Sequence, residues 1–106
     1  MRVLFLCSRA RLRSVTAARV FAAWPDVETD YAGLLPDADV PLDPEQLAWA
    51  DLVCVMEKSH RRRLDRGFRR WLKGKRVVCL DVRDEYALMQ PALVHLLEER
   101  VAPLLR

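Results

Sequence analysis

The chain has 106 residues and a mass of 12.3 kDa, which suffices for one hydrophobic core and excludes a multidomain architecture. Apolar residues make up 52% and charged residues 31% of the sequence, a balance that excludes a disordered or fibrous chain. The formal net charge is +3, and no apolar run suits a membrane span or a signal peptide, so we expect a cytoplasmic protein.

Hydrophobic patterns indicate the first elements. Residues 2–6 form a short apolar run that is typical of a buried strand in a parallel sheet. After a polar loop the apolar residues take helical spacing, and this helix must stop at Pro25. Its buried face comprises Ala17, Val20, Phe21 and Trp24. Residues 27–31 predict a second strand that closes at Gly33.

The middle of the chain contains a loop, a helix and a strand. Residues 34–42 include two prolines and show no clear period, so we expect a surface loop. Asp43, Pro44 and Gln46 have the spacing of a capped helix N-terminus. We expect this helix to end near Asp51 and the apolar residues 52–56 to form a third buried strand.

The last part of the chain begins with a strongly basic segment. Residues 57–76 carry ten basic and two acidic residues. Helical spacing within this segment predicts an amphipathic helix, broken near Gly67, with a basic outer face. The buried positions expected for it are Leu64, Phe68, Trp71 and Leu72.

A fourth strand is predicted over residues 76–80, followed by a loop over residues 81–90. Pro91 then begins a last helix. Its expected buried face comprises Leu93, Leu96, Leu97 and Val101. Strands and helices thus alternate, which predicts one α/β domain over residues 1–106: a three-layer α/β/α sandwich with a four-stranded parallel sheet. Ligands of such folds bind at the carboxyl ends of the strands.

The loop after the first strand contains a cysteine, five residues, an arginine and a serine, and leads directly into a helix. Its backbone N–H groups and the helix N-terminus can surround a tetrahedral oxyanion and stabilise the thiolate of Cys7. Arg13 can bind two phosphoryl oxygens, and Ser14 can hydrogen-bond the sulfur when it later becomes a leaving group. The candidate phosphate-binding residues are Ser8, Arg9, Ala10, Arg11, Leu12, Arg13 and Ser14.

Further motifs accompany this loop along nearly the whole chain. They are Val3-Leu-Phe-Leu-Cys7, Arg13-Ser14, Ala17, Phe21, Asp30-x-Ala32-Gly33, the run from Ala50 to Met56, and Asp84-Glu85-Tyr86. This set resembles the low-molecular-weight protein tyrosine phosphatases, in a compact bacterial form shorter than the usual members. The resemblance implies a phosphocysteine intermediate, with Cys7 as nucleophile, Arg13 as phosphate clamp and an aspartate of a late loop as general acid.

Asp84 is the preferred candidate for that acid, because Asp84-Glu85-Tyr86 stands where the family has Asp-Pro-Tyr. Its carboxyl would donate a proton to the leaving oxygen, and the carboxylate would then accept a proton from the attacking water. Asp81, which directly follows the predicted strand, is the alternative.

The loop departs from the family pattern at two partner positions. Arg9-Ala10 replaces Gly-Asn, and Tyr31 replaces a serine. In the family that Asn adopts a positive φ and bonds the serine, whereas alanine costs about 1 kcal/mol or more in this conformation and brings no amide. We therefore expect either a replaced network or a looser loop. Arg9 and Arg11 also make the rim cationic, which favours a substrate with more than one anionic group if they face the mouth.

Two classes of function follow. The first is a cysteine-dependent phosphatase that hydrolyses phosphotyrosine or a related phosphomonoester, on a protein or a small molecule, with no metal, organic cofactor or membrane partner. The second is a non-catalytic phosphate-binding or anion-binding module on the same scaffold. Nucleic-acid binding through residues 58–76 is less favoured, because the aromatic residues there follow core spacing and offer no stacking platform.

The remaining cysteines and histidines are expected to be structural. Three cysteines without a CxxC pair predict neither a disulfide framework nor a zinc site. Cys54 and Cys79 fall in predicted strands, which argues against arsenate reduction because that reaction needs resolving cysteines on mobile segments. His60 and His95 lie on predicted helices and are expected to be solvated or packed rather than catalytic.

Overall fold

A computed structural model describes the whole chain, residues 1–106. Four strands form one parallel sheet in the order β2-β1-β3-β4. The strands are β1 (Arg2–Cys7), β2 (Glu28–Gly33), β3 (Leu52–Val55) and β4 (Arg76–Cys79). The helices are α1 (Arg13–Ala22), α2 (Pro44–Trp49), α3 (Lys58–Phe68) and α4 (Pro91–Val101), with the 3-10 helices η1 (Arg69–Trp71) and η2 (Ala102–Leu105).

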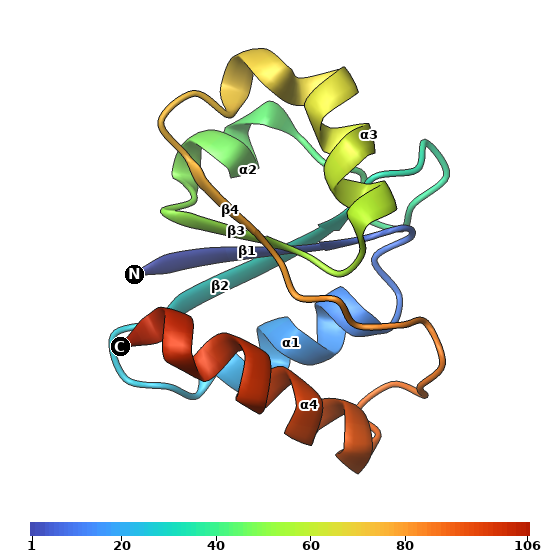
Figure 1. Ribbon diagram of the computed structural model, residues 1–106, viewed down its shortest axis with the longest axis vertical. Helices are drawn as coiled ribbons and strands as arrows, with labels where there is room; N and C mark the ends of the chain where they lie inside the picture. The colour runs from blue at the N-terminus through green and yellow to red at the C-terminus, as the bar shows by residue number, and fades with distance from the viewer.

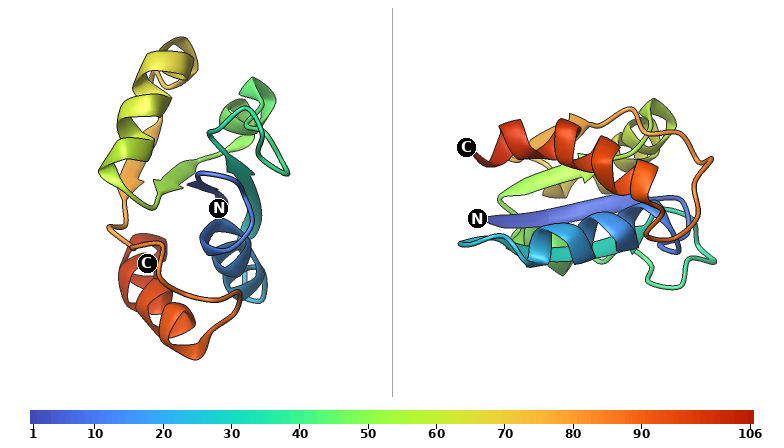
Figure 2. Two further views of the ribbon diagram at one scale, coloured as in Figure 1. Left: turned by 90° about the vertical axis from the view of Figure 1, so that its right-hand side faces the viewer. Right: turned by 90° about the horizontal axis from the view of Figure 1, so that it is seen from below.

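Helices cover both faces of the sheet, which confirms the predicted three-layer α/β/α sandwich (Figures 1 and 2). Helices α1 and α4 lie on one face, and α2 and α3 lie on the other. Phe5 of β1 packs in the core on the α1 side, whereas Leu4 and Leu6 pack on the opposite side. Because both faces are covered, β1 and β3 consist of continuous apolar runs. No helix combines the length and apolar character that crossing a membrane requires.

Local signals set two of the helix boundaries. Asp43 caps α2 by accepting a hydrogen bond from the backbone N–H of Glu45, and the side chain of Gln46 accepts one from the backbone N–H of Asp43. This capping box confirms the predicted helix start. Helix α3 ends one residue after Gly67 and continues as η1, which confirms the predicted break.

The prediction that Trp71 belongs to the core is wrong. Its side chain is 37% exposed, whereas Leu64 of the same predicted face is fully buried. The 3-10 geometry of η1 has about three residues per turn, so Trp71 rotates off the face that a regular helix would have continued. Trp71 instead packs against Phe68 at a ring-centroid distance of 5.9 Å and lies under the guanidinium of Arg70.

Two of the three free cysteines are structural. Cys54 lies fully buried in β3, and burial raises the pKa of its thiol to about 12, which leaves it protonated and unreactive. Cys79 is half-buried in β4 and packs against the core on the α2 and α3 side. Both positions agree with the expected packing role.

Strands β1 and β2 end side by side, with Cys7 paired in register with Gly33. The segment after β2 folds back over the loop after β1, and Gly33 lies where the two meet. A Cβ atom on Gly33 would lie 2.6 Å from the Cβ of Ala38 and 2.7 Å from the backbone oxygen of Ser8. Only glycine fits this contact without displacing the loop that follows Cys7.

Gly33→Ala is therefore expected to destabilise the fold by about 2 kcal/mol, because the added methyl group overlaps backbone and cannot relax by rotation. Gly67→Ala is the matched control. Gly67 lies in α3 with no atom within 4 Å of an added Cβ, so this change should raise stability by about 0.5 to 1 kcal/mol. Thermal unfolding of the two variants checks the difference. Equal Tm values would contradict the close approach at Gly33.

Candidate active site

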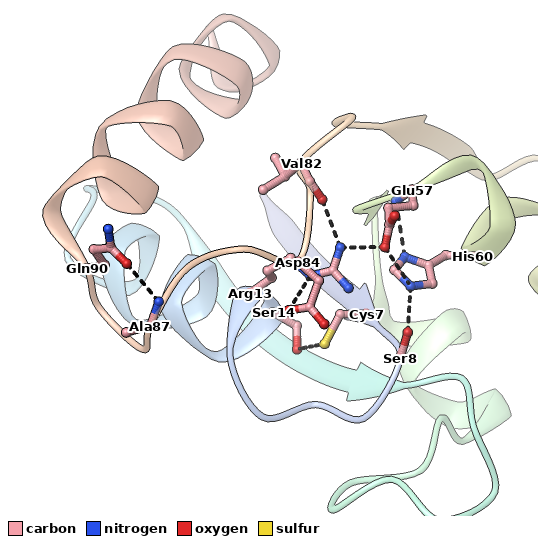
Figure 3. Close-up of polar contacts among 10 residues, drawn as sticks. All are labelled: Cys7, Ser8, Arg13, Ser14, Glu57, His60, Val82, Asp84, Ala87 and Gln90. Atoms are coloured by element: carbon pink, nitrogen blue, oxygen red, sulfur yellow. Dashed lines mark hydrogen bonds and ion pairs between the residues drawn. The ribbon is translucent and has the colours of Figure 1, made fainter.

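The loop between β1 and α1 forms one wall of a cleft of about 200 Å³ at the carboxyl edge of the sheet. The residues that line it are Cys7, Ser8, Arg9, Arg11, Leu12, Arg13 and Asp84. Cys7 is the last residue of β1 and Arg13 is the first residue of α1. Asp84 comes from the loop after β4, so three candidate catalytic residues meet in one cleft (Figure 3).

The sulfur of Cys7 is buried and has one polar partner. Cys7 Sγ lies 2.9 Å from Ser14 Oγ, and Cys7 is only 4% exposed. The hydroxyl group can donate this hydrogen bond to a thiolate. Leu12 is the N-cap of α1 and makes no side-chain cap, and the first turn carries no acidic residue, so the positive end of the helix stays available to an anion.

Arg13 is held from two sides, which fixes the direction of its guanidinium. Nη1 donates to the carboxylate of Glu57 at 2.7 Å and to the carbonyl oxygen of Val82 at 2.8 Å. Nε lies 3.7 Å from Oδ1 of Asp84, and the Arg13 side chain is 3% exposed. Nη2 has no hydrogen-bond partner in the protein. Because every buried polar side-chain atom has such a partner, Nη2 must be accessible, and the cleft that Arg13 lines gives it this access.

Glu57 is a functional residue that the sequence interpretation missed. The hydrogen bond from Arg13 lowers the pKa of the Glu57 carboxyl below its ordinary value, so it stays ionised as the counter-charge. The sequence did contain a signal for Glu57. It follows the apolar run of β3, which places it at the same carboxyl edge of the sheet as Cys7.

His60 is packed, and it connects α3 to the candidate loop. Its Nδ1 accepts a hydrogen bond from the backbone N–H of Glu57 at 3.1 Å, so the ring proton is on Nε2. Nε2 lies 2.9 Å from Oγ of Ser8 and donates to it. Burial and the charge of Arg13 lower the pKa of His60 to about 4, so the ring is neutral. His95 is exposed on α4, where it lies beside Glu99.

The loop keeps a positive φ at Ala10 without an asparagine. Ala10 has φ 59°, is buried and does not line the cleft. The loop is braced through its backbone, because the carbonyl oxygens of residues 7–9 accept hydrogen bonds of 3.0 Å from three N–H groups. The donors are Leu34, Leu35 and Asp39. Tyr31 packs instead against the core on the α1 side. The loop is therefore held by backbone hydrogen bonds, without a side-chain contact from residue 10.

Asp84 and Asp81 occupy different environments. Both side chains are exposed, but Asp84 lines the cleft, whereas Asp81 has φ 57° and does not line it. The loop that carries Asp84 is tied at both ends. Near its start the backbone N–H of Val82 donates to the carbonyl of Met56 at 2.8 Å. Near its end the backbone N–H of Met89 donates to Oγ1 of Thr16 at 3.1 Å. Asp84 is thus held over the cleft.

The buried, neutral His60 predicts a pH dependence of stability. Its folded pKa of about 4 lies below the ordinary 6.5, so the unfolded chain binds more protons between these values and stability falls as the pH drops from 6.5 to 4. We expect a loss of about 1 to 2 kcal/mol over this range, because solvent partly screens the charges around the ring. His60→Asn keeps an acceptor for Glu57 and should flatten the slope, as urea unfolding can measure. Protonation of the Glu57 carboxyl lowers stability mainly below pH 4.5, its ordinary pKa. The dependence of stability on pH above 4.5 therefore reports on His60.

Neither a scan of protein-family models nor a search of curated proteins finds a match. Solved structures do match over nearly their whole length. The YwlE arginine phosphatase from Geobacillus stearothermophilus has a TM-score of 0.76 at 22% identity, covering 98% of this chain and 92% of that chain. The tyrosine phosphatase Wzb from Escherichia coli K30, in complex with phosphate, has a TM-score of 0.79 at 18% identity, covering 97% and 94%. The low-molecular-weight protein tyrosine phosphatase from T. tengcongensis has a TM-score of 0.74 at 25% identity, covering 96% and 93%.

The chain has the low-molecular-weight protein tyrosine phosphatase fold. Because each match covers nearly all of both chains, this phosphatase fold accounts for the whole chain and not for one part of it. The fold that the sequence motifs implied is thereby confirmed. In this low-molecular-weight phosphatase fold the cleft at the end of β1 is the candidate active site.

Proposed function

We propose that the protein is a cysteine-dependent phosphatase that hydrolyses a phosphomonoester or a related phosphorylated group through a phosphocysteine intermediate. The contact of 2.9 Å between Cys7 Sγ and Ser14 Oγ, in a cleft that Arg13 and Asp84 also line, carries the proposal. The similar structures include proteins described as tyrosine phosphatases and as arginine phosphatases. Phosphotyrosine and phosphoarginine are therefore both candidate substrates, on a protein or as small compounds.

In the first step the Cys7 thiolate attacks phosphorus, and the bond between phosphorus and the leaving group breaks. Nη2 and Nε of Arg13 donate no hydrogen bond within the protein, and these two N–H groups can bind two equatorial oxygens of the phosphoryl group. The Asp84 carboxyl donates its proton to the leaving group. The products are the free leaving group and a phosphocysteine at Cys7.

In the second step water attacks the phosphocysteine and releases inorganic phosphate. The Asp84 carboxylate accepts a proton from the water, and the electron pair of the sulfur–phosphorus bond returns to Cys7. Ser14 donates a hydrogen bond to the sulfur as it regains negative charge. Asp84 ends protonated, ready for the next turnover.

Asp84→Asn tests the assigned acid. We expect this change to lower kcat for an aryl phosphate by about 10² to 10³-fold, with a larger loss for poorer leaving groups because they depend more on protonation. Asp81→Asn is the matched control, since Asp81 lies outside the cleft and its change should leave kcat within about twofold. Steady-state kinetics with a series of substituted phenyl phosphates make the measurement. A larger loss in Asp81→Asn would reverse the assignment.

The same assay separates an enzyme from a binding module. Phosphate release that depends on Cys7 supports the phosphatase. Calorimetric binding of inorganic phosphate with no release from any aryl phosphate would instead indicate the non-catalytic module.

A further inference from the structure

We propose that Arg9 and Arg11 bind a second anionic group of the substrate. The inference rests on the proposed phosphatase function and narrows its substrate class. The preferred substrate carries a carboxylate or a second phosphoryl group a few bonds from the phosphoryl group that Cys7 attacks. The second anion lies at the rim of the cleft, and the reacting phosphoryl group lies at its base beside Cys7 and Arg13.

Arg9 and Arg11 line the cleft, and the two terminal nitrogens of each guanidinium make no hydrogen bond in the protein. Arg9 and Arg11 line the same cleft as Cys7. Arg9 bonds Asp37 only through Nε, at 3.3 Å. Arg11 likewise uses only Nε, which lies 3.2 Å from both carboxylate oxygens of Asp39. The terminal Nη1 and Nη2 groups of both side chains therefore have no partner in the protein, and these groups form the outer fork that binds a carboxylate or phosphate.

The acidic partners bind the two arginines weakly enough for an anionic ligand to compete with them. The side chains of Arg9 and Arg11 are 49% and 54% exposed, and exposed ion pairs of this kind stabilise a protein by only about 0 to 1 kcal/mol. The backbone N–H of Asp39 also donates to the carbonyl of Arg9, so the segment that supplies the acids is attached to the loop. The ion pairs thus keep both side chains near the rim but hold them weakly, so each guanidinium can turn toward a ligand.

The cleft offers no aromatic surface for the rest of the substrate. None of its lining residues is aromatic, and Tyr86, the aromatic residue of the Asp84 loop, packs against the core on the α1 and α4 side. A cleft of about 200 Å³ has room for the phosphoryl group and one small adjoining group, but not for a larger substrate. The remainder of the substrate must lie against the rim, where charge and not ring stacking supplies recognition.

The first test compares two substrates of similar shape, 3-carboxyphenyl phosphate and 3-carbamoylphenyl phosphate. We expect the intact protein to favour the carboxylate by about three- to tenfold in kcat/KM, and added salt should reduce this ratio. The Arg9→Gln/Arg11→Gln double variant should bring the ratio close to one. Arg62→Gln, which changes an exposed arginine on α3 outside the cleft, should keep it. A ratio that stays unchanged in the double variant would overturn the inference.

The second test separates this inference from the proposed function. Calorimetry measures the affinities of phenylphosphonate and 3-carboxyphenylphosphonate, which cannot be hydrolysed. A carboxylate preference that the double variant loses supports the rim site even if no substrate is turned over. Turnover that depends on Cys7, without any carboxylate preference in either test, supports the phosphatase and overturns the rim site.

A pair of phosphopeptides that differ by Glu or Gln beside the phosphorylated residue identifies the source of the second anion. A larger preference in the peptide pair than in the phenyl pair assigns the anion to a protein substrate. A larger preference in the phenyl pair assigns it to a small phosphorylated acid.

Discussion

Cys7→Ser is expected to lower kcat for an aryl phosphate by about 10⁴-fold or more, to the limit of detection. A serine hydroxyl is a weak nucleophile unless a base removes its proton. Ser14 lies 2.9 Å from Cys7 and can stabilise an anion there, but its hydroxyl is not a base. The fold should survive, because the change replaces one small buried group by another of nearly the same shape. Steady-state kinetics and a thermal melt measure the two effects.

Cys79→Ser is the control for this substitution. Cys79 lies half-buried in β4 and does not line the cleft, so the variant should keep its turnover while losing a little stability. More than a tenth of the original kcat in a correctly folded Cys7→Ser variant would mean that another group attacks phosphorus.

Arg13→Lys is expected to lower kcat/KM by about 10³-fold, although the positive charge is conserved. In the native protein Nη1 of Arg13 donates hydrogen bonds to Glu57 and Val82, which leaves Nη2 and Nε for the phosphoryl group. One ammonium group cannot reach both sets of partners. The variant should also lose about 1 to 3 kcal/mol of stability, because the Val82 carbonyl loses its partner in the protein interior.

Arg19→Lys, an exposed change on the same helix, serves as the comparison and should leave both quantities nearly unchanged. Kinetics with phenyl phosphate and chemical unfolding test the pair. A loss of less than tenfold in Arg13→Lys would show that a single positive charge is enough and that the fixed fork contributes little.

The layered fold was predictable because its signals are local. Strands covered on both faces, such as β3, are continuous apolar runs, and the cap and proline of α2 mark its first turn. The prediction failed at Trp71, where the chain passes from an α-helix into a 3-10 helix and the period changes. Gly67 indicated where the helix breaks, but no local pattern indicated the 3-10 period that follows.

Part of the candidate site was also predictable, because its signals are local in the sequence. Cys7 and Arg13 lie in one short loop whose spacing carries the chemistry, and the resemblance brought in Asp84. The supporting contacts were not predictable. Arg13 is 44 residues from Glu57, and Ser8 is 52 residues from His60, so these contacts exist only after the sheet has brought the loop and α3 together. The sequence predicts a solvated or packed His60, and the structure shows it packed against the loop.

The contacts that hold the loop around Ala10 could not be predicted from the sequence either. The two departures from the family pattern indicated that a side-chain contact had been lost, but they did not show what replaces it. Backbone N–H groups of residues 34–39 hold the loop, and backbone contacts leave almost no trace in residue types. Gly33 is the exception, because its missing side chain is what allows the two segments to approach.

Trapping the covalent intermediate tests the proposed chemistry most directly. The Asp84→Asn variant, in which hydrolysis of the intermediate should be slow, is mixed with a reactive aryl phosphate and quenched within the first turnover. Mass spectrometry then locates the phosphoryl group. We predict one phosphoryl group per chain, on the peptide that contains Cys7, and none in a Cys7→Ala variant. Release of phosphate from the substrate with no phosphoryl group on Cys7 at any time would contradict the mechanism.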